Sequence, residues 1–271
     1  MEKLFLTPAE TMRAIVDNGR RVTVQSWPRT VVLSLLAGFY IAFGAELAVS
    51  VTHDAAGFVG QGIARFLGGS VFSLGLMLVV VCGAELFTGN SLLASSVLHG
   101  EISLGHLLEN WTIVILGNLA GALFLTWLMF HSRLWSGGSM ADHVVRIAAA
   151  KCQLSFEAAL IRGVLCNWLV CLAVFMATAA RDITGRIVAC YVPIMAFVAS
   201  GFEHSVANMF FIPMGIMLAG EGGKLEPALT WSNFFIANLL PVTLGNILGG
   251  VVFVAFAYWY VHLERTRPCR T

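Results

Sequence analysis

The chain alternates between long apolar stretches and short polar connections. A helix needs about 20 mainly apolar residues to cross the hydrocarbon core of a bilayer. Six stretches meet this requirement, over residues 30–51, 66–98, 107–130, 156–180, 187–218 and 234–261. The pattern therefore predicts an all-α membrane protein with six transmembrane helices, in a single domain that covers residues 1–271.

The segments outside the spans are polar. Residues 1–29 lack the apolar core of a signal peptide, and residues 263–271 form a short polar tail. Four apolar side chains of the first segment lie near one another on a helical projection: Leu6, Met12, Ile15 and Val16. We therefore expect residues 1–29 to form an amphipathic helix that lies at the membrane surface.

Charged residues are scarce and unevenly distributed. Hydrophobic types make up 58% of the chain and charged types 11%, whereas a soluble domain has about 25% charged residues. These proportions exclude a disordered chain, a nucleic-acid-binding protein and a disulfide-rich secreted module. Six spans place both termini on one side, which then carries ten of the 16 lysines and arginines. We expect an inner (plasma) membrane protein with cytoplasmic termini and an extracytoplasmic connection at residues 131–155.

Two polar, glycine-bearing segments interrupt the second and fifth spans with one shared pattern. Residues 83–90 and 201–208 both read G-x-E-x-x-x-x-N, and residues 116–121 and 244–249 both read L-G-N-[LI]-x-G. The sequence therefore contains two copies of a three-span unit, at residues 30–130 and 156–262. Because three is odd, the second copy must cross the membrane in the opposite sense. This predicts an inverted repeat, in which matching breaks mark a substrate site near the midplane.

The breaks offer chemistry suited to an anion. Each break starts a half-helix whose free N–H groups and partial positive charge attract negative charge. Thr88 and Ser205 are good N-cap types, so we expect their hydroxyls to satisfy such donors. We expect Glu85 and Glu203 to face inward and to accept hydrogen bonds from freed backbone N–H groups. The asparagines at the repeated positions are suited to cross-linking the broken segments: Asn90, Asn208, Asn118 and Asn246. The alternative is that both breaks are only packing kinks.

His204 lies within a break in the apolar core, while the other six histidines lie in connections or at span ends. A lone buried histidine is usually a hydrogen-bonded core residue, but an ionisable group inside a membrane span is a functional candidate by default. Its reference pKa of about 6.5 allows proton exchange near neutral pH. We interpret His204 as functional.

Other classes of function have weaker support. The sequence has no H-E-x-x-H motif and no converging carboxylates, so neither an enzyme nor a metal site is expected. One deep histidine is too few for a haem pair, and no cofactor is expected. An aquaporin-like channel for neutral solutes shares the predicted architecture, but the paired N-P-A motifs of that family are absent.

Four longer motifs resemble the formate–nitrite transporter family. They are CGAELFTGN at residues 82–90, RGVLCNWLVCLA at 162–173, ASGFEHSVANM at 199–209 and PVTLGN at 241–246. The likeness covers essentially the whole chain, beginning with LTPAE at residues 6–10. It implies an aquaporin-like fold and a homopentamer with one pore in each protomer. It also implies passage of small monovalent anions, namely formate, nitrite or hydrosulfide.

The resemblance further implies roles for single residues. It implies a central site formed by His204, Thr88 and Asn246. It implies a cytoplasmic constriction formed by Leu76 and Phe197. It also implies an outer constriction formed by Phe87, Asn167 and Val170. Lys151 matches a lysine of the outer vestibule that would attract anions at long range.

These roles suggest a mechanism. An anion is costly to dehydrate between apolar rings, and protonation removes most of that cost. In this hypothesis Lys151 concentrates the anion, Thr88 and the half-helix dipoles bind it, and His204 donates a proton. The neutral acid then crosses the apolar constriction. The run FIPMG at residues 211–215 resembles the formate-type branch of that family, so the resemblance favours formate, with nitrite and hydrosulfide as alternatives.

Overall fold

The computed structural model describes residues 4–222 and 226–264, and the regular elements within them are helices. Part of the predicted tail, residues 265–271, lies outside the described residues. Six helical stretches of the described chain are long and apolar enough to cross a membrane. They are α2 (Trp27–Thr52), α3 with α4 (Ala56–Phe72 and Leu74–Cys82), α6 (Leu104–Ser132), α8 (Phe156–Ala179), α9 (Ile183–Ser200) and a final run over Asn233–His262. The predicted all-α, six-span fold is confirmed.

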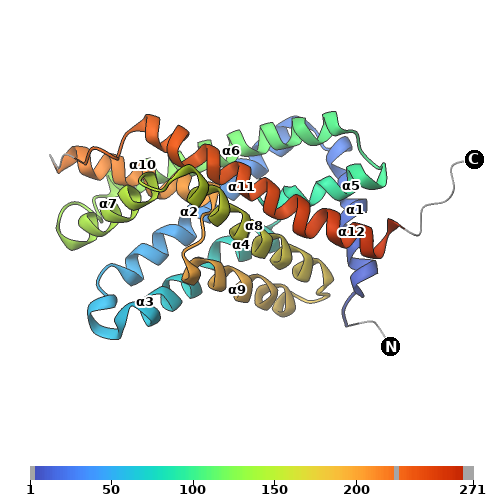
Figure 1. Cartoon of the computed structure of the whole chain (residues 1–271), viewed down its shortest axis with the longest axis horizontal. Coiled ribbons are helices and arrows are strands. Elements are labelled where there is room, and N and C mark those ends of the chain that lie inside the picture. The colour runs from blue at the N-terminus through green and yellow to red at the C-terminus, as the bar shows by residue number, and fades with distance from the viewer. Residues whose placement is uncertain (1–3, 223–225, 265–271) are drawn as a thin grey trace, which may run out of the picture.

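The remaining helices lie at the two ends of the bundle or follow its breaks (Figure 1). They are α1 (Pro8–Val24), η1 (Gly89–Leu93), α5 (Ala94–His99), α7 (Gly138–Cys152) and α10 (Ser205–Glu221). The final run comprises η2 (Asn233–Leu239), α11 (Leu240–Gly250), η3 (Val251–Phe256) and α12 (Ala257–His262). In Figure 1, α1, α5 and α12 lie at one end of the long axis, and α7 lies at the other end.

The second span starts and ends earlier than predicted, because it covers residues 56–82 instead of 66–98. Helix α3 starts at Ala56, ten residues before the expected start at residue 66. The added segment is rich in glycine and carries Gln61 and Arg65, which obscure the apolar pattern. Gly60 has a φ of +77°, which kinks the helix within this segment. Glycine adopts such a φ at little steric cost.

Helix α7 occupies the connection at residues 131–155, where the hydropathy pattern predicted no span. The helix is amphipathic and buries one face, formed by Ala141, Val144, Val145, Ala148, Ala149 and Cys152. That face packs chiefly against α10. The connection therefore contributes a helix to the protein body and places Lys151 near the second break.

Helix α1 packs against the bundle. A capping box starts it, in which Thr7 Oγ1 accepts from the Glu10 N–H at 3.4 Å and Glu10 Oε2 accepts from the Thr7 N–H at 2.9 Å. Met12, Ile15 and Val16 are buried in one apolar cluster with residues of η1, α5 and α12. The amphipathic helix predicted from the sequence is present. Its apolar face contacts protein at the end of the bundle. The expectation that it lies at the membrane surface stays a prediction.

Glycines allow the closest helix crossings. The most extensive helix contacts are those of α2 with α6 and of α8 with α11. A Cβ on Gly38 would lie 2.3 Å from the Asn118 carbonyl oxygen, and a Cβ on Gly245 would lie 2.1 Å from the Leu160 carbonyl oxygen. Small residues at such crossings let the backbones of membrane helices approach closely. These crossings bring α6 and α11 against the two breaks.

Candidate functional site

The two breaks begin in the same way. Helix α4 ends at Gly83 with φ +78°, and helix α9 ends at Gly201 with φ +76°. A left-handed residue after a helix is a common terminator, and glycine takes it without a side-chain clash. The chain leaves helical geometry after each glycine and resumes it at η1 and at α10.

The first break is tied to its surroundings by Asn118 of α6. The Asn118 Oδ1 accepts from the Phe87 N–H at 2.9 Å. Its Nδ2 donates to the carbonyl oxygens of Ser34 at 2.8 Å and Glu85 at 2.9 Å. One buried amide therefore satisfies three backbone groups around the break, as buried polar groups require.

The second break is tied in the same manner by Asn246 of α11. The Asn246 Oδ1 accepts from the Ser205 N–H at 2.9 Å. Its Nδ2 donates to the carbonyl oxygens of Gly163 at 2.8 Å and Glu203 at 3.0 Å. All of these bonds hold backbone in place. Asn246 thus supports the break next to His204, and the substrate contact expected for it stays a prediction.

The carboxylates at the breaks accept from asparagine side chains. Glu85 Oε2 accepts from Asn90 Nδ2 at 2.7 Å, and Asn90 Nδ2 also donates to Asn110 Oδ1 at 2.9 Å. We expected freed backbone N–H groups to donate to Glu85 and Glu203. Asparagine side chains donate to these carboxylates instead. The freed Phe87 N–H instead bonds to the Asn118 amide.

The second carboxylate has an equivalent network. Glu203 Oε2 accepts from Asn208 Nδ2 at 2.7 Å, and Asn208 Nδ2 also donates to Asn238 Oδ1 at 2.7 Å. The sequence analysis missed Asn110 and Asn238. Each lies eight residues before the asparagine of the L-G-N motif, on the same helical face, and this spacing was the available signal.

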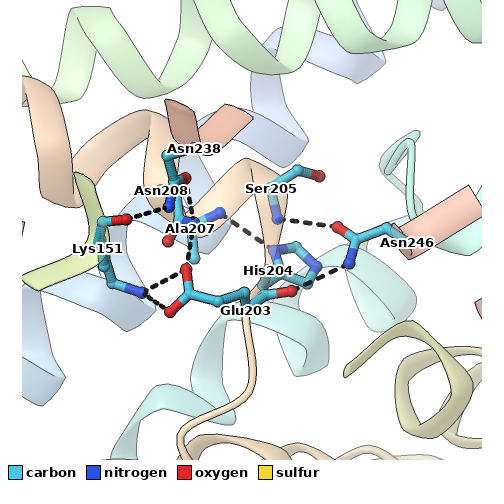
Figure 2. Close-up of polar contacts among 8 residues, drawn as sticks. All are labelled: Lys151, Glu203, His204, Ser205, Ala207, Asn208, Asn238 and Asn246. Carbon is cyan, nitrogen blue, oxygen red and sulfur yellow. Dashed lines mark hydrogen bonds and ion pairs between the residues drawn. The ribbon is translucent and has the colours of Figure 1, made fainter. Parts of the chain in front are cut away.

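Lys151 distinguishes the two networks, as Figure 2 shows. Its Nζ lies 2.9 Å and 3.1 Å from the two carboxylate oxygens of Glu203, and its side chain is 15% exposed. Nζ also lies 5.4 Å from the centre of the Phe211 ring. The Asn238 Nδ2 donates to the Lys151 carbonyl oxygen at 2.9 Å. Lys151 is therefore paired with Glu203 in the wall of the site. The resemblance implied a lysine in a vestibule that attracts anions at long range.

His204 is both a cap and a contact across the breaks. Its Nδ1 accepts from the Ala207 N–H at 3.1 Å and caps the start of α10. Its Nε2 lies 3.0 Å from Thr88 Oγ1, and both residues are buried. The N-cap roles predicted for Thr88 and Ser205 are wrong, because no helix N–H bonds to the Thr88 hydroxyl and the buried Ser205 hydroxyl has no partner among the described residues. The imidazole takes that role and presents its other nitrogen to Thr88.

Two cavities open toward opposite ends of the bundle. The α1-side cavity, of about 720 Å³, is lined at one end of α2 by Arg29 and Leu33. The α7-side cavity, of about 600 Å³, is lined at the other end of α2 by Ala48 and His53. His204 lines the α7-side cavity, whereas Leu86 and Gly89, close to Thr88 in sequence, line the α1-side cavity. The Thr88–His204 contact therefore lies between the two cavities.

The structure separates the residues of the expected cytoplasmic constriction. Leu76 lines the α1-side cavity, but Phe197 lines the α7-side cavity. The Phe197 ring stacks on the His204 ring at a centroid distance of 5.9 Å and meets Phe72 edge-on at 5.8 Å. Phe72 and Phe197 are thus the aromatic residues beside His204, and Leu76 belongs to the other side.

The residues of the expected outer constriction are buried and line neither cavity. Phe87 packs edge-on against Trp111 at a centroid distance of 5.9 Å, and Val170 is 1% exposed. Asn167 Nδ2 donates to the carbonyl oxygens of Thr88 at 3.1 Å and Asn246 at 2.6 Å. Asn167 therefore links the first break to α11, whose Asn246 side chain holds the second break.

Comparison with known proteins agrees with this geometry. Residues 9–260 match the family model described as Formate/nitrite transporter. The chain is 43% identical to a probable formate transporter of Methanothermobacter thermautotrophicus, over 97% of this chain and 100% of that protein. It is 37% identical to the formate channel FocA of Escherichia coli (strain K12), over 96% of this chain and 95% of that protein.

Two solved structures are also similar. A pentameric formate channel with formate bound has a TM-score of 0.77 and 38% identity, covering 88% of this chain and 98% of that chain. An FNT family ion channel has a TM-score of 0.83 and 33% identity, covering 93% of this chain and 98% of that chain. With its six apolar helices and a family match over nearly its whole length, the chain belongs to the formate/nitrite transporter family.

Proposed function

We propose that this protein conducts small monovalent anions, formate first among them, between the two cavities and past the Thr88–His204 contact. The observation that carries the proposal is the 3.0 Å approach of Thr88 Oγ1 to His204 Nε2. It joins two buried polar groups from two separate breaks, one beside each cavity. Formate is favoured because relatives over nearly the full length are named formate channels or transporters.

The hydrogen bonds of His204 define its neutral form. Because Nδ1 accepts from the Ala207 N–H, the proton of a neutral imidazole lies on Nε2. That Nε2–H points at Thr88 Oγ1 and can bind a carboxylate that takes the place of the hydroxyl. The first action of His204 on an anion is therefore to donate a hydrogen bond.

Proton transfer needs the imidazolium form, because a neutral imidazole is too weak an acid to protonate formate. The negative charge of an anion in the site favours that form. A second proton, taken from water in the α7-side cavity that His204 lines, then binds to Nδ1, and the Ala207 N–H loses its acceptor. The Nε2 proton passes to a carboxylate oxygen, which gives formic acid and a neutral imidazole with its proton on Nδ1. The cap of α10 is restored when Nε2 takes a proton from water and Nδ1 releases one, so that each formic acid carries away one proton drawn from water.

The walls around this site favour a neutral acid. Leu76 is 1% exposed and Phe197 is 3% exposed, and each borders one of the two cavities near the central contact. A charged group that leaves water without a partner loses several kcal/mol or more, whereas a protonated acid loses much less. Protonation at His204 therefore lowers the cost of passing these side chains.

In this proposal the protein forms a homopentamer in a lipid bilayer, and each protomer contains its own passage for the anion. The support is the solved pentameric formate channel and the large apolar side chains on the outside of the bundle, which need lipid or protein contacts. Examples are Phe58 and Phe66 of α3 and Phe124 and Trp127 of α6. The excess of positive charge beside α1 supports an inner membrane location with both termini in the cytoplasm.

The test is transport by purified protein in lipid vesicles that contain a pH-sensitive dye. We expect a formate gradient to acidify the vesicle interior faster than in protein-free vesicles, and we expect Thr88→Val to slow that change. Thr126→Val is the matched control, because Thr126 is buried and bonds only to the Ala122 carbonyl oxygen within α6. Competition by nitrite and hydrosulfide would rank the three anions. Fast osmotic shrinkage with a neutral solute and no anion flux would contradict the proposal and favour a neutral-solute channel.

A further inference from the structure

The α7-side cavity contains a lysine whose charge is already balanced. Lys151 contacts both oxygens of the Glu203 carboxylate, and the side chains of the pair are 15% and 5% exposed. Two opposite charges in contact produce a weak field at a distance. Lys151 is therefore poorly placed to draw anions into the cavity, although it lines the wall.

Two arginines line the same cavity from different helices. Arg65 lies on α3 and lines the cavity together with Gln61, Gly68 and Phe72. These residues are three or four positions apart, so they share one face of the helix. Arg146 lies on α7, five residues before Lys151. Both arginines are exposed, and neither has an ion-pair partner in residues 4–222 and 226–264.

The other ionisable groups of the cavity cancel only part of this charge. Asp54 is the remaining carboxylate, and its oxygen lies 3.8 Å from His53 Nε2. Burial lowers the pKa of His143, and the nearby charges of Arg146 and His53 lower that pKa further. His143 is therefore neutral at pH 7. His204 lies at the inner wall, beside Phe197. The cavity keeps a net positive charge, and the two arginines supply it.

We propose that Arg65 and Arg146 form an anion-capture site in the α7-side cavity, which holds a small monovalent carboxylate or an anion of similar charge before it reaches His204. Guanidinium groups suit this task because they stay charged at every working pH and can bind a carboxylate through two hydrogen bonds. In this assignment Lys151 is a positioning residue that holds Glu203 and the second break. The inference rests on the proposed anion channel, and it identifies Arg65 and Arg146 as the positively charged side chains that first bind the anion.

The experiment measures initial formate flux against formate concentration in proteoliposomes, with the protein oriented so that the α7-side cavity faces the added formate. Arg65→Gln, Arg146→Gln and the double variant remove the charge. We expect the formate concentration for half-maximal flux to rise about threefold in each single variant and about tenfold in the double variant at low salt. We expect the maximal flux to stay unchanged, and the differences to shrink at high ionic strength, where charges are screened.

Two controls separate charge from structure. Arg65→Lys and Arg146→Lys keep the positive charge and should restore most of the low-concentration flux. Arg133→Gln removes an arginine that is paired with Glu221 and does not line the cavity, so it should leave both the half-maximal concentration and its salt dependence unchanged. Because Arg65 and Arg146 are exposed, the variants should elute at the same oligomeric size as the unmodified protein.

Each other outcome overturns the inference. If the unmodified protein conducts formate and the double variant keeps its half-maximal concentration and salt dependence, the arginines do not capture anions and the proposed function stands. If the lysine variants are as impaired as the glutamine variants, the arginines act through structure and not through charge. If the unmodified protein conducts no formate, the proposed function itself fails and this inference fails with it.

Discussion

The break after α4 and the break after α9 are held by the same set of bonds. In each, a left-handed glycine ends the first helix, one asparagine amide satisfies three backbone groups, and a glutamate accepts from a second asparagine. The positions that match in the two copies carry different side chains. The residue that corresponds to His204 is Leu86, and the residue that corresponds to Thr88 is Val206.

This difference shows how a repeated scaffold makes one site. Each break contributes a single polar group to the central contact, the Thr88 hydroxyl from the first and the His204 imidazole from the second. Only the second break has a lysine on its glutamate within the described residues. We interpret the shared bonds as the means of holding non-helical backbone inside the membrane, and the unshared residues as the chemistry.

The largest expected effect is the loss of Lys151. Lys151→Met leaves the buried Glu203 carboxylate without its counter-charge, which should cost about 3 kcal/mol of stability. The double variant Lys151→Met with Glu203→Gln removes both charges and should recover most of the loss. Thermal unfolding of the detergent-solubilised protein measures both. Equal melting temperatures for the single variant and the unmodified protein would show that the Lys151–Glu203 pair does not contribute to stability.

Removal of the scaffold asparagines should act equally on the two breaks. Asn118→Ala and Asn246→Ala each leave two backbone groups of a break unpaired, one N–H and one glutamate carbonyl, and we expect each variant to cost about 2 kcal/mol or more. The same thermal assay compares them. The control is Asn233→Ala at the start of the last helical run, where a half-buried amide bonds to one backbone carbonyl, that of Ala228. A large effect at one site and none at the other would refute the equivalence of the two breaks.

The glycine caps should have smaller, matched effects. An alanine at Gly83 or Gly201 meets no atom within 4 Å, so the cost comes from the positive φ alone, about 1–2 kcal/mol. Gly57→Ala in α3 is the control, because that site is equally open and no positive φ is required there. The difference in melting temperature between the two cap variants should be small compared with the shift of either from the control.

The smallest expected effect distinguishes the two glutamates. Glu85→Gln keeps the oxygen that accepts from Asn90 and removes a charge that has no lysine or arginine partner among the described residues, so it should change stability by less than about 1 kcal/mol. Glu203→Gln removes the counter-charge of Lys151 and should lower stability clearly more than Glu85→Gln does. Matching losses for the two variants would mean that Lys151 does not distinguish the second break from the first.

Much of this scaffold could be predicted from the sequence. Hydropathy predicts six spans because membrane helices must be long and apolar, and the repeated G-x-E-x-x-x-x-N pattern locates both breaks. The roles of Asn118 and Asn246 as cross-links also follow from the pattern, because polar amides within an apolar helix need partners. Their partner residues, Ser34 and Gly163, lie on other helices and depend on helix packing that the sequence does not display.

The geometry of the centre could not be predicted in the same way. The sequence indicates that His204 is buried and polar, but not that its Nδ1 replaces a serine hydroxyl as the cap of α10. The resemblance implies only that Lys151 lies in an outer vestibule. The low hydropathy of α7 does not reveal that this helix packs into the protein body and pairs Lys151 with Glu203. The division of Leu76 and Phe197 between two cavities depends on how α4 and α9 cross, which single-sequence patterns leave open.

The most direct test of the central claim is formate-driven acidification across a pH series by the unmodified protein, His204→Asn and His204→Phe, with protein-free vesicles subtracted. Asparagine can cap α10 but cannot carry a proton, whereas phenylalanine can do neither. We predict that His204→Asn retains the folded oligomer but loses most of the acidification and its dependence on pH. We predict that His204→Phe loses stability as well. Unchanged acidification with unchanged pH dependence in His204→Asn would contradict proton transfer at His204.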